Sequence, residues 1–280
     1  MAFRTASPGR RRGGNSRLIF AGVIALIAFV SFLSTRSTNP VTGQTQYVAL
    51  TPAQEIALGL QAAPQMAAEF GGLHPDTDAQ ALIDAIGARL VANGPATEAP
   101  YQFDFHLLAD PNVVNAFALP GGQVFITAAL FNKLETEGQL AGILAHEIGH
   151  IIERHGAERL AKERLTAGLV GAAAVAGSDP DNPLGGSSAM LAAAVGKLIN
   201  MRYGREDELE CDMWGVRLSA AAGYDPHAMI RVMEILDEAA KGPRPPEFLS
   251  THPDPGNRIE RIRATIKREF PKGLPPGLEP

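Results

Sequence analysis

The pentapeptide His146-Glu147-Ile148-Gly149-His150 has the residue types and the spacing of a metal-dependent hydrolase. On an α-helix, residues four apart project from the same face, one turn from each other. Two imidazoles placed in this way can bind one Zn²⁺ at about 2.0–2.1 Å, and Glu147 can act as general base on a water molecule. The pentapeptide alone leaves open a pair of surface histidines beside a solvated glutamate. The motif predicts a zinc site with Glu147 as its catalytic base.

A catalytic zinc ion needs a third protein ligand and an open position for water. The metzincin arrangement is excluded, because it requires glycine at position 153 and histidine at position 156, where this chain has Glu153 and Gly156. Within the acidic run 208–212, Glu208 and Asp212 are four apart and share a helix face. One can bind the metal while the other hydrogen-bonds a ligating histidine. A solvated acidic helix start remains the alternative, and spacing alone does not choose among these acids.

Four sequence blocks give the chain a family resemblance: residues 115–122, 146–150, 205–212 and 251–258. With these blocks it resembles the zinc metallopeptidase family that contains HtpX, the CAAX prenyl endopeptidases and the OMA-type peptidases, and it is most similar to single-domain bacterial envelope members of the BepA type. The resemblance implies an α+β fold that is mainly helical, of the gluzincin type, with a small β-sheet beside the HExxH helix.

The resemblance also implies roles for single residues. Glu208 becomes the third zinc ligand, and Asp212 becomes the hydrogen-bond partner of a ligating histidine. His252 becomes a possible fourth ligand, acting as a reversible latch or a transition-state donor, with an ordinary loop histidine as the alternative. Arg205 becomes an electrostatic support of the active site or an ordinary ion-pair residue. Cys211 replaces the small residue of the family, and we expect it to be a packing residue.

A β-hairpin is expected next to this site, because strand-like runs at 113–119 and 123–127 flank a Pro-Gly-Gly turn. By the resemblance, the substrate would bind as an added strand along a sheet edge. The candidates to border the cleft are Asn115, Ala116, Phe117 and Ala118, with ordinary core strands as the alternative. Arg258 and the remaining histidines are expected to be structural or solvated: His74, His106, His155 and His227.

The elements that must position these residues are predicted from apolar periodicity and capping patterns. Thr51-Pro52-Ala53-Gln54 has the pattern of a capped helix start. The small apolar segments 167–176 and 190–199 are too short to span a membrane and are expected to be buried helices. The pattern predicts a strand at 101–108 and helices at about 51–70, 76–93, 140–165, 206–222, 226–241 and 255–269.

Charge is distributed unevenly along the chain. The 25 Lys and Arg and 30 Asp and Glu give a net charge of −5, but residues 1–40 hold six arginines and no acid. The remainder carries −11, which argues against nucleic acid as a partner. A single cysteine excludes an intrachain disulfide framework. Apolar residues 18–33 would form a helix of about 24 Å, slightly short of the ~30 Å hydrocarbon core.

These features predict a chain of four parts: a signal anchor or signal peptide at 1–36, a linker at 37–50, a zinc metallopeptidase domain at 51–270 and a flexible tail at 271–280. The basic end of an anchor would be cytoplasmic. The body would then face the periplasm of a bacterial cell envelope, held at the inner membrane by residues 18–33, or secreted if the segment is cleaved.

The predicted function is zinc-dependent endopeptidase activity, with one Zn²⁺ per chain, on misfolded or misassembled envelope proteins. The expected partners are such unfolded substrates and the membrane, through the N-terminal segment. One alternative is a chaperone-like envelope assembly factor whose metal site is latched and mostly inactive. Another is a multi-spanning membrane peptidase like HtpX, against which the single candidate span argues.

Overall fold

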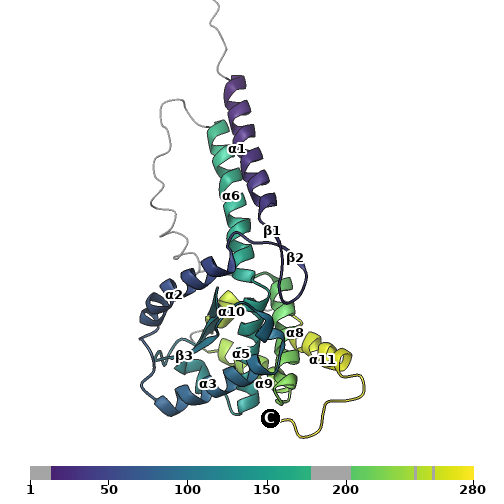
Figure 1. Ribbon diagram of the computed structural model, residues 1–280. Helices are drawn as coiled ribbons and strands as arrows, with labels where there is room; N and C mark the ends of the chain where they lie inside the picture. Colours follow the sequence, from purple (N-terminus) through teal and green to yellow (C-terminus); the bar gives the residue numbers. More distant parts are fainter. Residues whose placement is uncertain (1–13, 178–202, 243–244, 254–255) are drawn as a thin grey trace, which may run out of the picture.

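The structure is a computed structural model that describes residues 14–177, 203–242, 245–253 and 256–280. A body of helices around a small sheet carries two long helices that run side by side away from it, α1 (Gly14–Ser34) and α6 (His155–Gly177) (Figure 1). The other helical elements are α2 (Pro52–Glu69), α3 (Thr77–Ala92), the 3₁₀ turn η1 (Pro95–Glu98), α4 (Ala128–Phe131), α5 (Glu137–Ile152), α8 (Arg205–Ala221), α9 (Ala228–Ala240), α10 (Phe248–Thr251) and α11 (Arg258–Glu269). The strands are β1 (Arg36–Thr38), β2 (Thr45–Tyr47), β3 (Asp104–Leu108), β4 (Ala116–Leu119) and β5 (Gln123–Thr127). The predicted α+β, mainly helical fold is confirmed.

The three-stranded sheet has the order β3-β5-β4, with β3 parallel and β4 antiparallel to β5. The hairpin predicted from the Pro-Gly-Gly turn is therefore β4–β5. Its glycines are required, because Gly121 and Gly122 have φ angles of 89° and 117°. A Cβ atom on Gly122 would lie 2.0 Å from the Gln102 carbonyl oxygen. The turn leaves β4 as an edge strand of the sheet.

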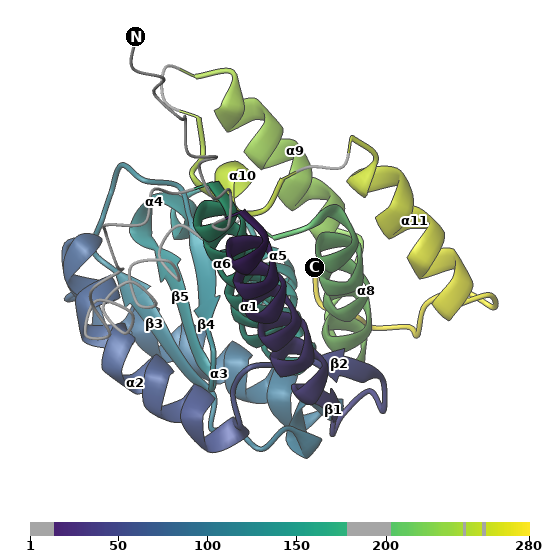
Figure 2. The same ribbon diagram turned by 90° about the horizontal axis from the view of Figure 1, so that it is seen from above.

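Helix α5 is the centre of the body. It packs on the sheet and α3 on one side and on α8 and α9 on the other (Figure 2). Every residue from Gly138 to Ile152 is buried. At Gly149 a Cβ atom would lie 2.9 Å from Cβ of Trp214 and 3.2 Å from Cα of Cys211. Glycine in the HExxH motif thus lets α8 approach α5 closely, which places the acidic start of α8 beside the two histidines.

The helix start predicted from the capping pattern at Thr51 is present, and the helix predicted at 76–93 also begins at a capping residue. Thr51 caps α2 with a capping box completed by Gln54, and Asp76 caps α3. The single helix predicted at 140–165 is wrong, because the chain breaks it between α5 and α6. Arg154 has a φ angle of 59° there, and its buried guanidinium donates to Glu55 at 2.6 and 3.0 Å. Apolar periodicity continues across such a one-residue turn and does not reveal it.

The helix predicted at 167–176 is part of α6, but it is not buried as predicted. Gly168 packs against Ala28, but Leu169 and Val170 of α6 are 45% and 63% exposed. Apolar side chains of α1 are exposed as well: Leu18, Ile19, Phe20, Val23, Leu26, Ile27, Phe29, Val30 and Leu33. Among the described residues, no helix is both long enough and apolar enough to cross a membrane. The segment predicted at 190–199 lies outside the described residues.

The segments expected to be a linker and a loose tail are both ordered parts of the body. In the 37–50 segment, β1 and β2 pair, and the buried Asn39 amide donates to the Ile152 carbonyl at 2.8 Å, at the end of α5. Helix ends leave such carbonyls without helical partners. In the tail, Glu279 accepts from Asp225 at 2.7 Å and pairs with Arg89 at 3.1 Å. A side-chain amide holds the first segment and a backbone hydrogen bond holds the second, and composition reveals neither contact.

Candidate metal centre

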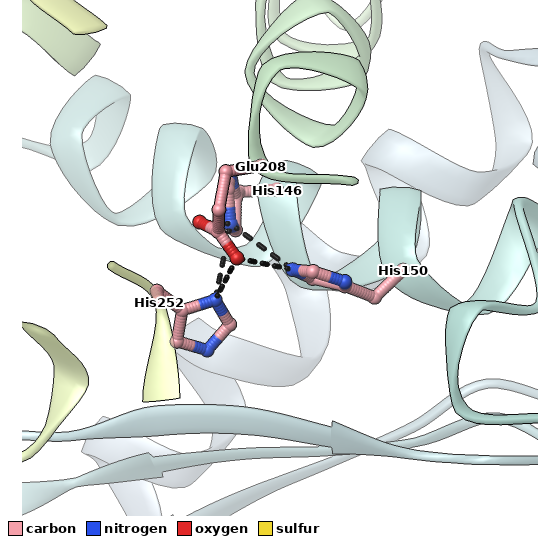
Figure 3. Close-up of side chains that lie close together, drawn as sticks. All are labelled: His146, His150, Glu208 and His252. Atoms are coloured by element: carbon pink, nitrogen blue, oxygen red, sulfur yellow. Dashed lines mark hydrogen bonds and ion pairs between the residues drawn. The ribbon is translucent and has the colours of Figure 1, made fainter. Parts of the chain in front are cut away.

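Four side chains from three parts of the fold converge on one point (Figure 3). His146 and His150 project from α5, with their Nε2 atoms 3.3 Å apart. Glu208, on the first turn of α8, places Oε2 at 3.4 Å from His146 Nε2 and Oε1 at 3.6 Å from His150 Nε2. His252 follows α10 and places Nδ1 at 3.4 Å from His146 Nε2. All four residues are buried.

These distances fit a bound metal ion. The ligand atoms of a tetrahedral zinc ion at about 2.0–2.1 Å lie about 3.3–3.4 Å from one another. The two imidazole nitrogens and the Glu208 oxygens lie 3.3–3.6 Å apart. His252 Nδ1 is 3.1 Å from Glu208 Oε1, so it lies where a fourth ligand would. The residues therefore form a His/His/Glu cluster that can hold a divalent metal, with His252 beside it.

Glu147 lies next to this cluster without contributing a ligand atom. Its side chain is fully buried, and neither carboxylate oxygen has a hydrogen-bond partner among the described residues. The Nε2 atom of His252 lies 3.7 Å from Glu147 Oε1. Burial raises the pKa of the Glu147 carboxyl, although nearby histidines oppose the shift. Such an orphaned carboxylate fits a group that exchanges protons with a bound molecule.

Asp212 lies where the resemblance placed it, behind His146. Its Oδ1 is 3.1 Å from His146 Nδ1, the ring nitrogen that points away from the cluster. Arg258 of α11 donates to both Asp212 oxygens, at 2.6 and 2.9 Å, and its Nη1 lies 3.3 Å from Glu208 Oε2. Burial raises the Asp212 pKa, but the charge and hydrogen bonds of Arg258 and His146 bring it below its ordinary value. Asp212 therefore stays ionised and can fix the His146 tautomer.

Arg258, which was not among the expected site residues, lies buried against the cluster, while Arg205 lies at the surface. Arg205 lies exposed at the start of α8 and makes no hydrogen bond or ion pair with any residue that the structure describes. The guanidinium that lies beside Asp212 and Glu208 belongs to Arg258 and not to Arg205. The signal was present in the sequence, because Arg258 closes the 251–258 block, but only the α8–α11 packing brings its side chain under Glu208.

The ionisation of the ligands follows from their neighbours. Burial alone would lower the pKa of His146, but hydrogen bonds with Asp212 and Glu208 raise it to about 9. Burial would raise the Glu208 pKa, but the charges and hydrogen bonds of His252 and His146 hold it well below its ordinary value. Burial lowers the pKa of His150, so its imidazole is neutral. Without metal, the cluster thus holds a Glu208 carboxylate beside a protonated His146.

The candidate substrate strand borders the cluster. Ala118 lines two small hollows, one reaching His150 and the other reaching His252. Asn115 also lines the second hollow, and its buried Oδ1 has no hydrogen-bond partner among the described residues. Phe117 lines this hollow too but also packs on the aromatic core, and the Ala116 side chain is fully buried. The strand therefore meets the metal cluster mainly through Ala118 and its main chain.

Tyr203 and Cys211 complete the surroundings. The Tyr203 ring stacks on His150 with a centroid distance of 3.8 Å and lies between the two hollows. Its backbone N–H donates to Thr251 just before His252. Cys211 is fully buried, and burial raises the pKa of its thiol well above the ordinary value. It lies against Gly149 and outside the four-residue cluster, as a packing residue would.

The fold and the site together define a class: a gluzincin-type metallopeptidase domain, in which an HExxH helix and a glutamate from a later helix form one metal site. The sequence pattern described as peptidase family M48 matches residues 77–266. The chain belongs to this family, which is the family that the resemblance indicated.

Relatives support the same assignment. The chain is 32% identical over 255 residues to the beta-barrel assembly-enhancing protease of Yersinia pestis, covering 89% of this chain and 51% of that protein. The protein of the same name from Escherichia coli strain K12 is 32% identical over 257 residues, covering 88% and 50%. Mitochondrial metalloendopeptidase OMA1 of Schizosaccharomyces pombe is 30% identical over 242 residues, covering 82% and 68%. The chain spans about half the length of these bacterial relatives.

Proposed function

We propose that this protein is a zinc-dependent endopeptidase that cleaves misfolded or misassembled proteins of the bacterial cell envelope. The observation that carries the proposal is the convergence of His146, His150 and Glu208 at ligand distances, beside the buried Glu147 carboxylate, whose oxygens have no hydrogen-bond partner among the described residues. One zinc ion per chain is proposed, because two imidazoles and a carboxylate are a common donor set of catalytic zinc sites. The relatives are named as proteases, which supports peptide hydrolysis over the chaperone-like alternative.

The chemistry divides between the metal and the chain. Zinc in such a site supplies Lewis acidity that activates water and polarises a carbonyl group. Glu147 is placed to take the proton from the attacking water and to pass it to the leaving amine. Its raised pKa suits this exchange, because a carboxyl that holds a proton more tightly is a better base. Asp212 and Arg258 hold His146 and Glu208 in place through buried, charged hydrogen bonds.

The edge strand β4 is proposed to bind the substrate in an extended conformation. Thr127 N–H donates to the Asn115 carbonyl at 3.0 Å, and partners in an antiparallel pair alternate between bonded and non-bonded positions. Ala116 and Ala118 therefore direct their main-chain groups away from β5, toward the free edge. A substrate strand paired there would gain affinity from main-chain hydrogen bonds and demand little sequence.

His252 is proposed to be a reversible latch. Its Nδ1 lies at ligand distance from the cluster, where it would displace the water that the reaction needs. Its other ring nitrogen faces Glu147. The Tyr203 N–H donates to the carbonyl of Thr251, the residue before His252, and the Tyr203 ring stacks on His150. Movement of the His252 side chain would open the fourth position and release Glu147 together.

The bacterial relatives suggest a place in the cell envelope, since their name refers to β-barrel assembly. The finer proposal is that residues 18–33 hold the protein at the inner membrane with its body in the periplasm. The nine exposed apolar side chains of α1, which projects from the body, support an apolar environment for this helix (Figure 1). Fractionation of cells that express the full chain or a variant lacking residues 1–36 tests this: both versions in the same fraction would refute it.

The activity is tested with purified full-length protein and unfolded casein. Dialysis against a chelator should abolish cleavage, and one equivalent of Zn²⁺ should restore it. Glu147→Gln should remain inactive after the same treatment, because the amide cannot accept the proton. Cleavage that survives chelation, or equal cleavage by wild type and Glu147→Gln, would refute the proposed function.

A further inference from the structure

The second ring nitrogen of His150 has a partner that no known motif of the chain accounts for. His150 Nδ1 lies 3.1 Å from Nδ1 of His155, the first residue of α6. His155 Nε2 in turn lies 3.2 Å from Glu210 Oε2 on α8. His155 is 4% exposed, whereas the Glu210 side chain is 43% exposed. A chain of polar contacts therefore runs from the metal cluster through a buried histidine to a carboxylate at the surface.

The direction of these hydrogen bonds follows from valence. The proposed ligand atom of His150 is Nε2, because that atom faces His146 Nε2 and Glu208. A neutral imidazole that binds a metal through Nε2 carries its proton on Nδ1. The buried Nδ1–H must then donate, and His155 Nδ1 is the acceptor at hydrogen-bond distance. His155 consequently carries its own proton on Nε2 and donates it to the Glu210 carboxylate.

The break between α5 and α6 makes this contact possible. In a continuous helix, residues five apart are rotated by about 140° around the axis and do not meet. The left-handed turn at Arg154 redirects the chain, so the His150 and His155 rings lie 5.1 Å apart, edge to face. Arg154 is itself fixed by two hydrogen bonds to Glu55 and one to the Leu50 carbonyl. These hydrogen bonds hold the turn in the geometry that brings His155 next to Nδ1 of His150.

We propose that His155 is a positioning residue that orients His150 for metal binding, with Glu210 holding His155 from the outer side. The inference rests on the proposed function, since it assigns to His150 the role of a metal ligand. Each ligating histidine then has its own acceptor: Asp212 for His146, and His155 for His150. Such partners fix the tautomer and the ring direction of a ligand, and their loss typically costs about 10–100-fold in metal affinity or activity.

A competing arrangement uses the same atoms. His150, His155 and Cys211 also form a group that could hold a metal, with the Cys211 sulfur 3.5 Å from His155 Nδ1. A metal there would bind His150 through Nδ1 and remove the proton that the proposed hydrogen bond needs. The two arrangements differ in stoichiometry: the positioning role requires one metal per chain, and the competing site adds a second.

The test compares three histidine variants of the full-length protein. His155→Phe keeps a ring of similar size but removes the acceptor. His155→Asn places an amide oxygen near the position of Nδ1 and should restore the hydrogen bond. His106→Phe is the matched control, because this half-buried histidine also contacts an aromatic ring, that of Phe125, and is hydrogen-bonded, to Gln123 at 2.9 Å, but lies on β3. Metal content, zinc affinity by chelator competition, and the visible spectrum of the Co²⁺-substituted protein are measured for each.

Wild type should bind one metal per chain. His155→Phe should lose zinc affinity about 10–100-fold and show an altered Co²⁺ spectrum. His155→Asn should recover both the affinity and the spectrum. The control should match wild type. A second metal in wild type, or unchanged affinity and spectrum in folded His155→Phe, would overturn the positioning role. If His155→Phe does not fold, the test rests on folded His155→Asn. A zinc affinity or Co²⁺ spectrum of this variant that differs from wild type would then overturn the positioning role. Wild type that binds no zinc would instead refute the proposed function, so the two failures are distinct.

Discussion

Replacing Arg258 with methionine should weaken both the fold and the metal site. Arg258 makes two hydrogen bonds to Asp212 and an ion pair with Glu208, and all three side chains are at most 3% exposed. Methionine keeps the packing volume but removes the Arg258 guanidinium from two buried carboxylates. Removing one partner of a buried pair costs about 3–5 kcal/mol. For a chain of this size, that lowers the melting temperature by about 6–20 °C.

The chain supplies a control for this change. Arg217 of α8 makes a similar two-bond pair with Glu269 of α11, at 3.1 Å for both bonds, but its side chain is 40% exposed. Arg217→Met should cost at most about 1 kcal/mol, since water screens the pair. Both variants are compared by thermal unfolding of the metal-free protein and by zinc affinity. Equal, small effects of the two changes would refute the assignment of Arg258 to the site.

The cost of Arg258→Met should also depend on pH. The folded-state pKa of Asp212 lies below its ordinary value, so ionised Asp212 stabilises the fold above the unfolded pKa of about 3.9. This contribution disappears as the pH falls through the lower folded-state pKa. Wild type and Arg258→Met should therefore converge in stability on acidification below about pH 4. A stability gap that stays constant from pH 7 to pH 3 would show that the lost interaction is not ionic.

Three further predictions follow from the cluster and the edge strand. His252→Ala should raise casein cleavage at least about tenfold if the latch leaves at most about 10% of molecules open; unchanged activity and metal affinity would exclude a latch. Ala118→Pro should raise KM about 2- to 12-fold, because it removes one main-chain hydrogen-bond donor worth about 0.5–1.5 kcal/mol. The zinc content of this variant should stay the same. An unchanged KM would show that the substrate binds elsewhere. Zinc binding at pH 7.5 should release a proton, because the pKa of His146 is about 9 without metal. Calorimetry in buffers of different ionisation enthalpy measures the number of protons released. A release of zero protons would contradict the prediction.

The elements with local signals could be predicted from the sequence. The spacing of His146 and His150 requires only one helix, and the capping pattern at Thr51 marks a helix start directly. The β4–β5 hairpin follows from its glycine turn. For Glu208, the helical spacing to Asp212 left several acids open, and only the family resemblance selected it as the expected ligand.

The rest depends on contacts between elements, which local patterns do not encode. Arg258 reaches Asp212 only because α11 packs on α8, and an arginine at a helix start looks the same when it is solvated. His155 meets His150 only because one residue, Arg154, adopts a left-handed conformation that apolar periodicity does not show. The ordered tail likewise depends on backbone hydrogen bonds to the α8–α9 turn.

Metal content and peptidase activity, measured together on wild type, Glu147→Gln and Glu208→Ala, test the central claim most directly. Glu147 contributes no ligand atom, so Glu147→Gln should keep one zinc per chain and lose cleavage. Glu208 lies 3.4 and 3.6 Å from the two imidazoles, so Glu208→Ala should lose both zinc and cleavage. Full zinc content in Glu208→Ala, or cleavage by Glu147→Gln at the wild-type rate, would contradict the proposed metal site and its chemistry.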